Sequence, residues 1–223
     1  MKKFIFLLSI ALSFNLSAQD TIEKSVGEFS TLKVYDLINV KMIKSDENRA
    51  VIVGDNRKEV QIINKNGKLK VRMNLEESYD GNNTVVKLYY TSVEVIDANE
   101  GAKITVEDPI EQFEIDLKTQ EGGEITAQLK TTYANMRAVT GGIINVSGSS
   151  KNQDISIYTG GVFNGEDFKT QQTEVSINAA GEAYLNASEY VDVRIKAGGD
   201  VYIYGNPKKV DESKVLGGRI KRM

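Results

Sequence analysis

Pairs of small residues recur at nearly constant spacing through the second half of the chain, and hydrophobic residues alternate with polar ones on both sides of each pair. The steps between successive pairs are 21, 19, 19, 20, 18 and 19 residues. Alternation of period two is typical of β-strands that bury one face, and glycine permits the backbone angles of a tight corner. The pairs, which we expect to form such corners, are Gly101-Ala102, Gly122-Gly123, Gly141-Gly142, Gly160-Gly161, Ala180-Gly181, Gly198-Gly199 and Gly217-Gly218.

The alternation also predicts which side chains face the interior. Before the corners these are Ile96, Ala98, Met136, Ala138, Thr140, Ile155, Ile157, Thr159, Val175, Ile177, Ala179, Val193, Ile195 and Ala197. After the corners they are Ile104, Val106, Ile125, Ala127, Ile144, Val146, Ala183, Leu185, Val201 and Ile203. Many members of both groups are small, so we expect a narrow interior.

Two short strands in every turn of about 19 residues, stacked in register, predict an all-β fold of the parallel β-helix or β-solenoid class. The competing structure is an antiparallel meander or sandwich with glycine turns. Hairpins favour Asn-Gly or Asp-Gly at each two-residue turn, whereas the small pairs here recur only at every second strand. The pattern therefore favours the solenoid.

The pattern divides the chain into four segments. Residues 19–90 form a β-rich lobe of lower regularity, in which Leu32/Val34, Val51/Val53, Leu69/Val71 and Leu88/Tyr90 recur at steps of 19, 18 and 19. The frame then slips, because Ile96 follows Leu88 by only eight residues. We place a break near Thr91, the regular array at 91–206, and a C-terminal cap or tail at 207–223, with Pro207 ending the last strand.

Residues 1–18 have the pattern of a secretory signal peptide. Lys2 and Lys3 precede an apolar run from Phe4 to Leu16, and small residues lead to a cleavage point after Ala18. The run has 13 residues, fewer than the roughly 20 that span a bilayer as a helix. We therefore expect export across the inner membrane, to the periplasm or the cell surface, with no membrane insertion of the mature chain.

Composition removes many kinds of chemistry. The chain has no Cys and no His, which excludes disulfides, thiol nucleophiles, Ser-His-Asp triads and sites built on Cys or His ligands. Loss of the signal peptide leaves 28 − 2 = 26 basic against 31 acidic residues. A net charge of −5 disfavours nucleic acid. The apparent basic cluster, which a solvated tail explains best, is Lys208, Lys209, Lys214, Arg219, Lys221 and Arg222.

One column of outward side chains suggests a ligand site. Four residues after successive corners stand Thr105, Thr126, Asn145, Asn164, Tyr184 and Tyr202, with Tyr204 two residues further on. Stacked coils place such residues about 5 Å apart. Asn145, Asn164, Tyr184, Tyr202 and Tyr204 are thus candidates for binding a glycan. The alternative is a structural ladder in which like side chains stack on one another.

Other polar groups give weaker signals. Acidic candidates for a glycosidase or lyase are Glu107-Asp108, Glu166-Asp167, and Asp154 near Glu174, although such an enzyme needs two carboxyls in one cleft. The segment with Glu76, Glu77, Asp80, Asn82 and Asn83 lacks the spacing of a calcium loop. No glycine pair is followed by the Lys-Ser/Thr of a phosphate loop. We assign no catalytic residue, metal or cofactor.

Three stretches resemble a known family. They are Phe29–Asn56 (FSTLKVYDLINVKMIKSDENRAVIVGDN), Val86–Asp108 (VKLYYTSVEVIDANEGAKITVED) and the corner GGIIN at Gly141–Asn145. In this order they resemble the Bacteroidetes family of unknown function described as the putative auto-transporter adhesin, head GIN domain. The resemblance covers nearly all of the mature chain. It implies a secreted or cell-envelope β-helix, and the family name implies adhesion.

Three functions remain open, in this order. The first is a secreted, non-enzymatic recognition module for a glycan or a surface protein of the envelope or a host. The second is a structural envelope protein that binds another protein, and the third is a carbohydrate-active enzyme. A groove near Tyr184 and Tyr202 favours glycans, a flat apolar patch favours a protein, and a cleft with two close carboxylates favours an enzyme.

Overall fold

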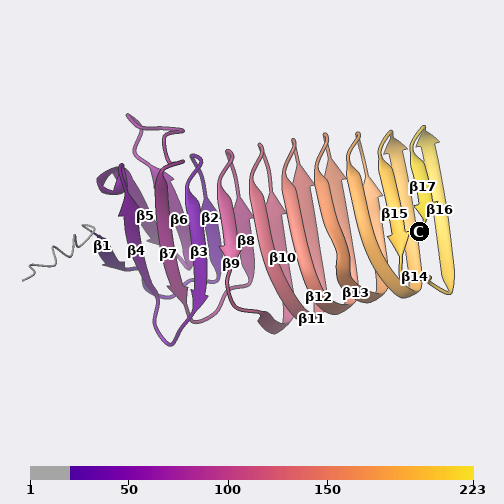
Figure 1. Ribbon diagram of the computed structural model, residues 1–223, viewed down its shortest axis with the longest axis horizontal. Coiled ribbons are helices and arrows are strands. Elements are labelled where there is room, and N and C mark those ends of the chain that lie inside the picture. The colour runs from indigo at the N-terminus through magenta and orange to yellow at the C-terminus, as the bar shows by residue number, and fades with distance from the viewer. Residues whose placement is uncertain (1–20) are drawn as a thin grey trace, which may run out of the picture.

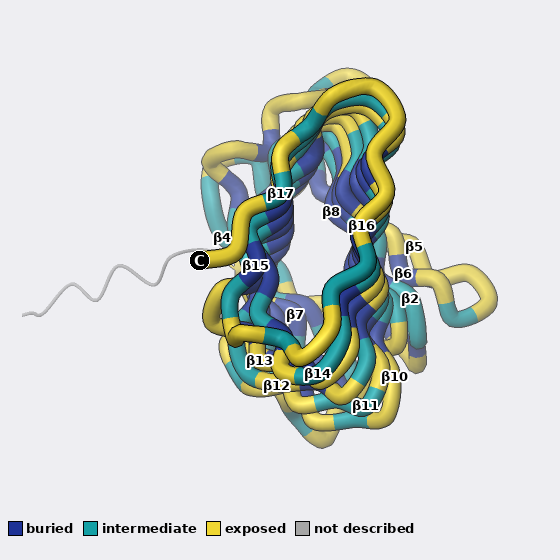
Figure 2. Tube along the Cα trace, turned by 90° about the vertical axis from the view of Figure 1, so that its right-hand side faces the viewer, coloured by how far each residue is buried: buried dark blue, intermediate teal, exposed yellow. Residues whose placement is uncertain are grey.

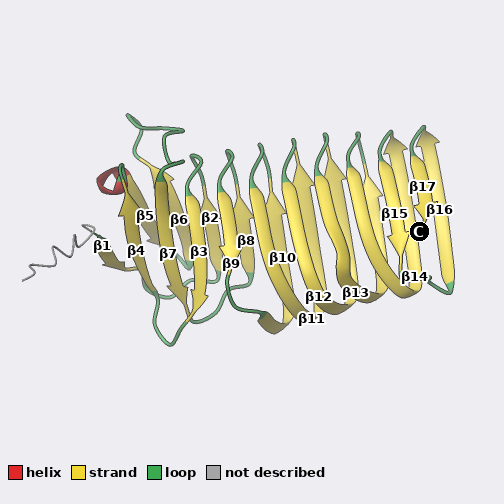
Figure 3. Ribbon diagram, viewed as in Figure 1, coloured by secondary structure: helices red, strands yellow, loops and turns green. Residues whose placement is uncertain are grey.

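The computed structural model describes residues 21–223 and confirms the predicted fold class, a parallel β-solenoid of about 7 turns with about 19-residue spacing. Figure 1 shows the coils stacked in one row from the N-terminal to the C-terminal end. Figure 3 shows strands throughout, apart from the single 3-10 turn η1 (Arg57–Glu59) in the described part of the chain. The predicted signal peptide lies outside the described residues.

The strands carry the following bounds. In chain order they are β1 (Ile22–Ser25), β2 (Thr31–Val34), β3 (Asn39–Lys44), β4 (Arg49–Gly54), β5 (Val60–Lys65), β6 (Lys68–Met73), β7 (Thr84–Tyr90), β8 (Val95–Ala98), β9 (Lys103–Val106), β10 (Ile110–Thr119), β11 (Glu124–Val139), β12 (Ile143–Tyr158), β13 (Val162–Ile177), β14 (Glu182–Ala197), β15 (Asp200–Tyr204), β16 (Lys209–Leu216) and β17 (Arg219–Arg222). Among the described residues no helix is long and apolar enough to cross a membrane.

Two facing walls enclose the core. The front sheet, in which the strands that follow a corner lie, consists of β3, β7, β9, the first halves of β11 to β14, β15 and β17, with β4 added antiparallel to β7 and β1 antiparallel to β4 at its N-terminal end. The back sheet, in which the strands that precede a corner lie, consists of β2, β6, β8, β10, the second halves of β11 to β14, and β16, with β5 added antiparallel to β6. Figure 2, viewed along the stack, shows β4, β15 and β17 on one side and β5, β6 and β16 on the other. Because β11 to β14 bend in the middle and belong to both walls, all 17 strands form one continuous hydrogen-bonded sheet.

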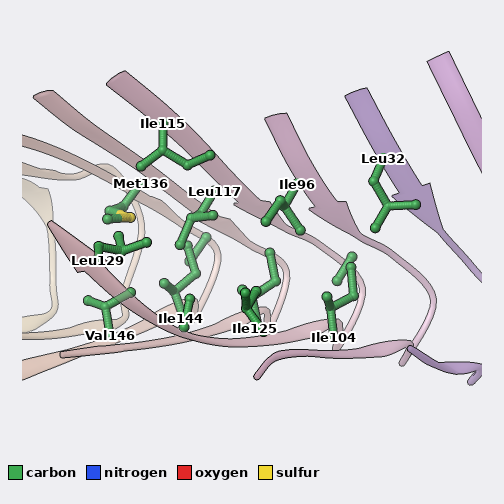
Figure 4. Packing of buried hydrophobic residues seen from close by; sticks show 14 of the residues in the cluster. Leu32, Ile96, Ile104, Ile115, Leu117, Ile125, Leu129, Met136, Ile144 and Val146 are labelled. Carbon is green, nitrogen blue, oxygen red and sulfur yellow. The ribbon is translucent and has the colours of Figure 1, made fainter. Parts of the chain in front are cut away.

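Neighbouring coils of the array are parallel and in register. Ile125 pairs with Ile144, and Ile144 pairs with Phe163. The hydrophobic side chains of the two walls meet in the middle, as Figure 4 shows for Ile104, Ile125 and Ile144 below and for Leu117 and Met136 above. Burying each such aliphatic side chain contributes roughly 2 kcal/mol.

Each corner is a two-residue turn with two consecutive positive φ angles. At one corner φ is 49° at Thr159 and 76° at Gly160, and the Gly161 N–H donates to the Tyr158 carbonyl at 3.2 Å. Such a turn folds the chain back on itself and so joins the two walls. Gly161 has a different role, because a Cβ there would lie 2.5 Å from the Ala138 carbonyl oxygen. The first glycine provides the turn angle, and the second permits contact with the preceding coil.

The geometry of the turn differs from the prediction for part of the interior. Thr140, Thr159 and Ala179 are exposed and Ala197 is half-buried, so the prediction that these four point inward is wrong. Thr140 and Thr159 already have the positive φ of the turn, which rotates their side chains away from the core. The remaining predicted interior residues are buried, with Ile157 and Ile177 at 0% exposure.

The N-terminal part stacks in an order that differs from the chain order. β2 lies between β6 and β8, and β3 lies between β7 and β9, all in parallel. Strands β4 and β5 run antiparallel to β7 and β6. The residues of β4 that are fully buried are Ala50 and Ile52, so Val51 and Val53 face outward and their place in the 19-residue recurrence is coincidental.

The C-terminal residues form one more coil. β16 pairs with β14 and β17 pairs with β15. Register places Glu212 and Lys214 at interior positions, opposite the buried Val193 and Ile195. Glu212 accepts a charged hydrogen bond from Arg222 of β17 at 3.3 Å. The end of the solenoid therefore carries charged groups where the inner coils carry aliphatic ones.

Candidate functional site

The predicted outward column exists as one register line on the front sheet. Thr126 pairs with Asn145, Asn145 with Asn164, Asn164 with Tyr184, and Tyr184 with Tyr202. Tyr204, the fifth candidate, lies two residues further along β15, opposite Asn186. The structure thus brings all five predicted residues to one face, over the strands β12 to β15.

The polar half of this column is a chain of hydrogen bonds. Asn164 Nδ2 donates to Asn145 Oδ1 at 2.7 Å. Asn145 Nδ2 in turn donates to Glu124 Oε1 at 3.0 Å and to Thr126 Oγ1 at 3.3 Å. These bonds fix the two amides before any ligand arrives, which lowers the entropy cost of binding.

The aromatic half is a stack of rings. The rings of Tyr184 and Tyr202 lie 4.6 Å apart at 4°, and Lys221 lies over the Tyr202 ring at 5.3 Å. Because the rings face each other along the solenoid axis, a ligand on this surface meets their edges and hydroxyls. The Tyr184 hydroxyl donates to Glu182 Oε2 at 2.8 Å. This hydrogen bond, with smaller contributions from burial and nearby charge, raises the pKa of Tyr184 to about 12.

A depression of about 620 Å³ lies beside the amides. Its wall is created by a bulge in β13, where the register with β14 shifts between Gly165 and Lys169. The bulge turns Glu166 and Asp167 outward. The residues that line the depression are Val106, Glu107, Thr126, Ala127, Gln128, Asn145, Val146, Ser147, Asn164, Glu166 and Asp167.

Members of two of the three predicted carboxylate pairs line this depression. They are Glu107, just after β9, and Glu166 and Asp167 of β13, whereas Asp108 is not part of the lining. Glu107 is also 3.7 Å from the Lys41 ammonium, and Asp108 accepts the Lys44 backbone N–H at 2.9 Å. Carboxylates together with amides and hydroxyls supply both donors and acceptors, as a ligand rich in hydroxyl groups requires.

The third pair lies on the back sheet, away from this depression. Asp154 pairs in register with Glu174. Burial raises the pKa of Asp154, although its hydrogen bond with Ser156 and the charge of Arg194 act in the opposite direction. The arrangement is a row of outward acidic side chains on neighbouring coils, with Arg194 3.7 Å from Glu174.

Polar groups of the loop 74–83 hold the loop itself. Asn74 Oδ1 accepts the backbone N–H groups of Glu76 and Glu77 at 3.1 and 2.9 Å, and Asn56 Nδ2 donates to Asp80 Oδ2 at 2.7 Å. Within residues 21–223 no three acidic side chains converge as a metal site would require.

Two features of the surface were not predicted from the sequence. Phe113 is 66% exposed, and its ring lies 5.3 Å from that of Tyr133. A cationic face is also present on β5 and β6, where the alternation Lys68, Lys70, Arg72 was a readable signal. By contrast, much of the C-terminal basic cluster is paired, for example Lys208 with Glu189 at 2.6 Å.

Comparison with known proteins gives a family and a fold. Residues 28–207 match the family described as putative auto-transporter adhesin, head GIN domain, and no curated protein matches the chain. A putative adhesin from Bacteroides fragilis superposes with a TM-score of 0.84 at 17% identity, covering 92% of this chain and 96% of that one. A putative adhesin from Parabacteroides merdae gives 0.70 at 16%, covering 92% and 95%. A putative lipid binding protein from Parabacteroides distasonis gives 0.68 at 14%, covering 92% and 96%. At such identities the likeness concerns the fold.

Proposed function

The chain belongs to the family described as putative auto-transporter adhesin, head GIN domain, and on that premise we propose that it is an adhesin-like recognition protein of the cell envelope. The predicted signal peptide exports it to the periplasm or the cell surface. It acts by binding rather than by catalysis, and its ligand is a saccharide bound at the front-sheet depression.

The observation that carries this proposal is the composition of the depression. Asn145 and Asn164 line it together with Glu107, Glu166 and Asp167. Sugar hydroxyls both donate and accept hydrogen bonds, so paired amides and carboxylates are suitable partners for them. The hydrogen-bonded strands beneath keep these groups in place, and Tyr184 and Tyr202 extend the polar surface along the same column.

A second candidate is recognition of another protein of the envelope. Phe113 and Tyr133 form an exposed aromatic pair, and Phe113 lines a depression of about 670 Å³ together with Val93, Val95 and Glu94. Exposed aromatic side chains of this kind are enriched in protein interfaces.

The test is binding of purified residues 19–223 to an array of bacterial and host glycans. Two variants report on the site: Asn164→Ala/Glu166→Gln in the depression and Tyr184→Ala/Tyr202→Ala on the adjoining stack. The matched control is Glu174→Gln, the same chemical change on the back sheet. Thermal melts establish that every variant is folded.

Saturable binding that weakens about tenfold or more, roughly 1.4 kcal/mol, in the depression variant but not in the control supports the proposal. Wild-type protein that binds no glycan overturns the saccharide assignment, and the Phe113 surface then becomes the site to test against envelope proteins. Release of sugar during incubation would overturn the non-enzymatic assignment.

A further inference from the structure

The outer face of the β5–β6 hairpin is strongly cationic. The hairpin turn Asn66-Gly67 has φ angles of 53° and 72°, and pairing places Lys65 beside Lys68 and Ile63 beside Lys70. A groove of about 420 Å³ runs over this face. It is lined by Ile63, Lys65, Asn66, Lys68, Lys70 and Arg72, which include four cations and no carboxylate.

The three lysines of this groove lack acidic partners, whereas other cations of the described chain, on the neighbouring strand β2 and elsewhere, form ion pairs. Lys33, on the next strand of the back sheet, is bound to Asp97 at 2.5 Å, and Lys209 is bound to Asp211 at 2.6 Å. No described carboxylate forms an ion pair with Lys65, Lys68 or Lys70. A chain with an acidic excess therefore concentrates unneutralised positive charge on one hairpin, where it attracts anions.

Arg72 contributes a guanidinium group to the lining of the groove. Its Nη2 donates to Gln61 Oε1 at 3.2 Å, whereas its buried Nε has no hydrogen-bond acceptor. Arg72 also borders the neighbouring depression of about 310 Å³ that contains Tyr35 and Tyr79. Guanidinium groups suit carboxylate, sulfate and phosphate oxygens because they donate in parallel.

We propose that the outer face of the β5–β6 hairpin binds a linear polyanion, an acidic polysaccharide. Lys68, Lys70 and Arg72 point outward from one strand, and alternate residues of a strand are about 7 Å apart. A row of cations at this interval offers several contacts to one extended chain that carries repeated negative charges.

The shape and composition of the groove argue against two other anionic partners. Binding to a membrane surface is strengthened by exposed apolar or aromatic anchors beside the cations, whereas Ile63, at 44% exposure, is the single apolar residue of the lining. Binding of single-stranded nucleic acid relies on aromatic side chains that stack on the bases, and the groove lining contains none. A lining with one apolar residue and no aromatic residue therefore favours an acidic polysaccharide over a membrane or a nucleic acid.

The site is independent of the proposed saccharide depression. The hairpin belongs to the back sheet in the N-terminal part, away from β11 to β13 along the stack (Figures 1 and 2). The depression lies on the front sheet over β11 to β13. Loss of binding at one site leaves the other intact, so the two proposals fail separately.

The experiment measures binding of residues 19–223 to heparin and to polygalacturonate, with neutral dextran as the uncharged chain. The variant is Lys68→Glu/Lys70→Glu. It leaves Arg72 and its bond to Gln61 in place. The control is Lys151→Glu/Lys196→Glu, which makes the same change in net charge at two exposed sites outside the hairpin. Melting temperatures verify folding, and a Lys68→Gln/Lys70→Gln variant replaces the first one if the reversed charges prevent expression.

We expect both acidic polysaccharides to bind, dextran not to bind, and affinity to fall as salt screens the charges. The hairpin variant weakens binding about tenfold or more, a change expected when two adjacent contacts become repulsive, and the control changes little. Equal loss in the two variants would show an effect of net charge alone and overturn the site. Absence of polysaccharide binding also overturns it, whether or not anionic vesicles or a single-stranded oligonucleotide bind.

Discussion

The regular array and the N-terminal part use the same two walls but build them from different sequence relationships. In the array Ile144 pairs with Ile125, 19 residues earlier. In the N-terminal part Leu32 pairs with Leu69 and with Ile96, at separations of 69 − 32 = 37 and 96 − 32 = 64 residues. Each array coil therefore contacts its neighbour in the chain, whereas the β2–β3 coil is inserted between coils that form later in the sequence.

The corners differ in the same way. The array turns at glycine, as at Gly160, where a positive φ carries little steric cost. The corner between β2 and β3 uses Asp36 and Leu37, with φ of 59° and 61°. Leu37 is unfavourable in this conformation. The corner is held instead by tertiary hydrogen bonds from the Met73 and Tyr79 backbone N–H groups to the Asp36 carboxylate at 3.0 and 3.2 Å.

This contrast shows two ways to fix a coil. A local turn encodes its own geometry, so it repeats in the sequence wherever it repeats in space. A corner fixed by distant groups leaves no periodic sequence signal. Closing a loop of 64 rather than 19 residues costs only about 1 kcal/mol more in entropy. Packing of the inserted coil on both sides offsets this cost.

The largest expected effect is the loss of the array core. Ile157→Asp introduces an unpaired charge at a position with 0% exposure, and such a charge destabilises by about 4 kcal/mol or more. We expect the variant not to fold, as measured by circular dichroism and thermal melting. Ser156→Asp, on the adjacent outward position, is the control. A wild-type melting temperature for Ile157→Asp would contradict the assigned rung.

The next prediction distinguishes the roles of the two glycines of one corner. Gly161→Ala places a Cβ 2.5 Å from the Ala138 carbonyl oxygen, whereas a Cβ at Gly160 meets no atom within 4 Å. We expect a loss of about 3 kcal/mol for Gly161→Ala from the clash and about 1 kcal/mol for Gly160→Ala from its positive φ. Urea denaturation of both variants measures the difference. Equal losses would mean that the coils do not contact each other closely at the corner.

The smallest of the three effects concerns the corner of the N-terminal part. Asp36→Ala leaves the Met73 and Tyr79 N–H groups without their acceptor, with a cost of about 2 kcal/mol. We expect faster amide hydrogen exchange in loop 74–83 and β2–β3, and unchanged exchange in β11 to β14. Asp36→Asn keeps one acceptor oxygen, so its exchange rates should lie between those of the wild type and those of Asp36→Ala. Uniform acceleration across the chain would show that the two regions unfold as one unit.

The candidate site could be predicted only in part from the sequence. The column from Asn145 to Tyr202 follows from the corner positions, because residues four places after successive corners lie side by side in stacked coils. The depression beside it depends on the bulge after Gly165. Relative to β12 the bulge adds one residue, which lengthens this coil from 19 to 20 residues, and the sequence pattern did not show where along the coil that residue would lie.

The cationic groove could be predicted only in part from the sequence, for a related reason. Lys68, Lys70 and Arg72 alternate along one strand, but the groove also needs Lys65 from the antiparallel partner strand. The acidic residues that neutralise other cations come from distant positions, as Asp97 does for Lys33. Whether a lysine is neutralised depends on which carboxylates the fold brings near it.

The sequence by itself determined the fold class, the length of each coil, the corner positions and most of the array interior, because these features arise from local backbone preferences and the alternation of side chains. Only the tertiary structure decided the stacking order of β2 and β3, the outward rotation of Thr140 and Thr159, the stacking of Tyr184 on Tyr202 and the shape of both grooves. These depend on contacts between residues far apart in the chain, and their free energies appear only after the coils have packed.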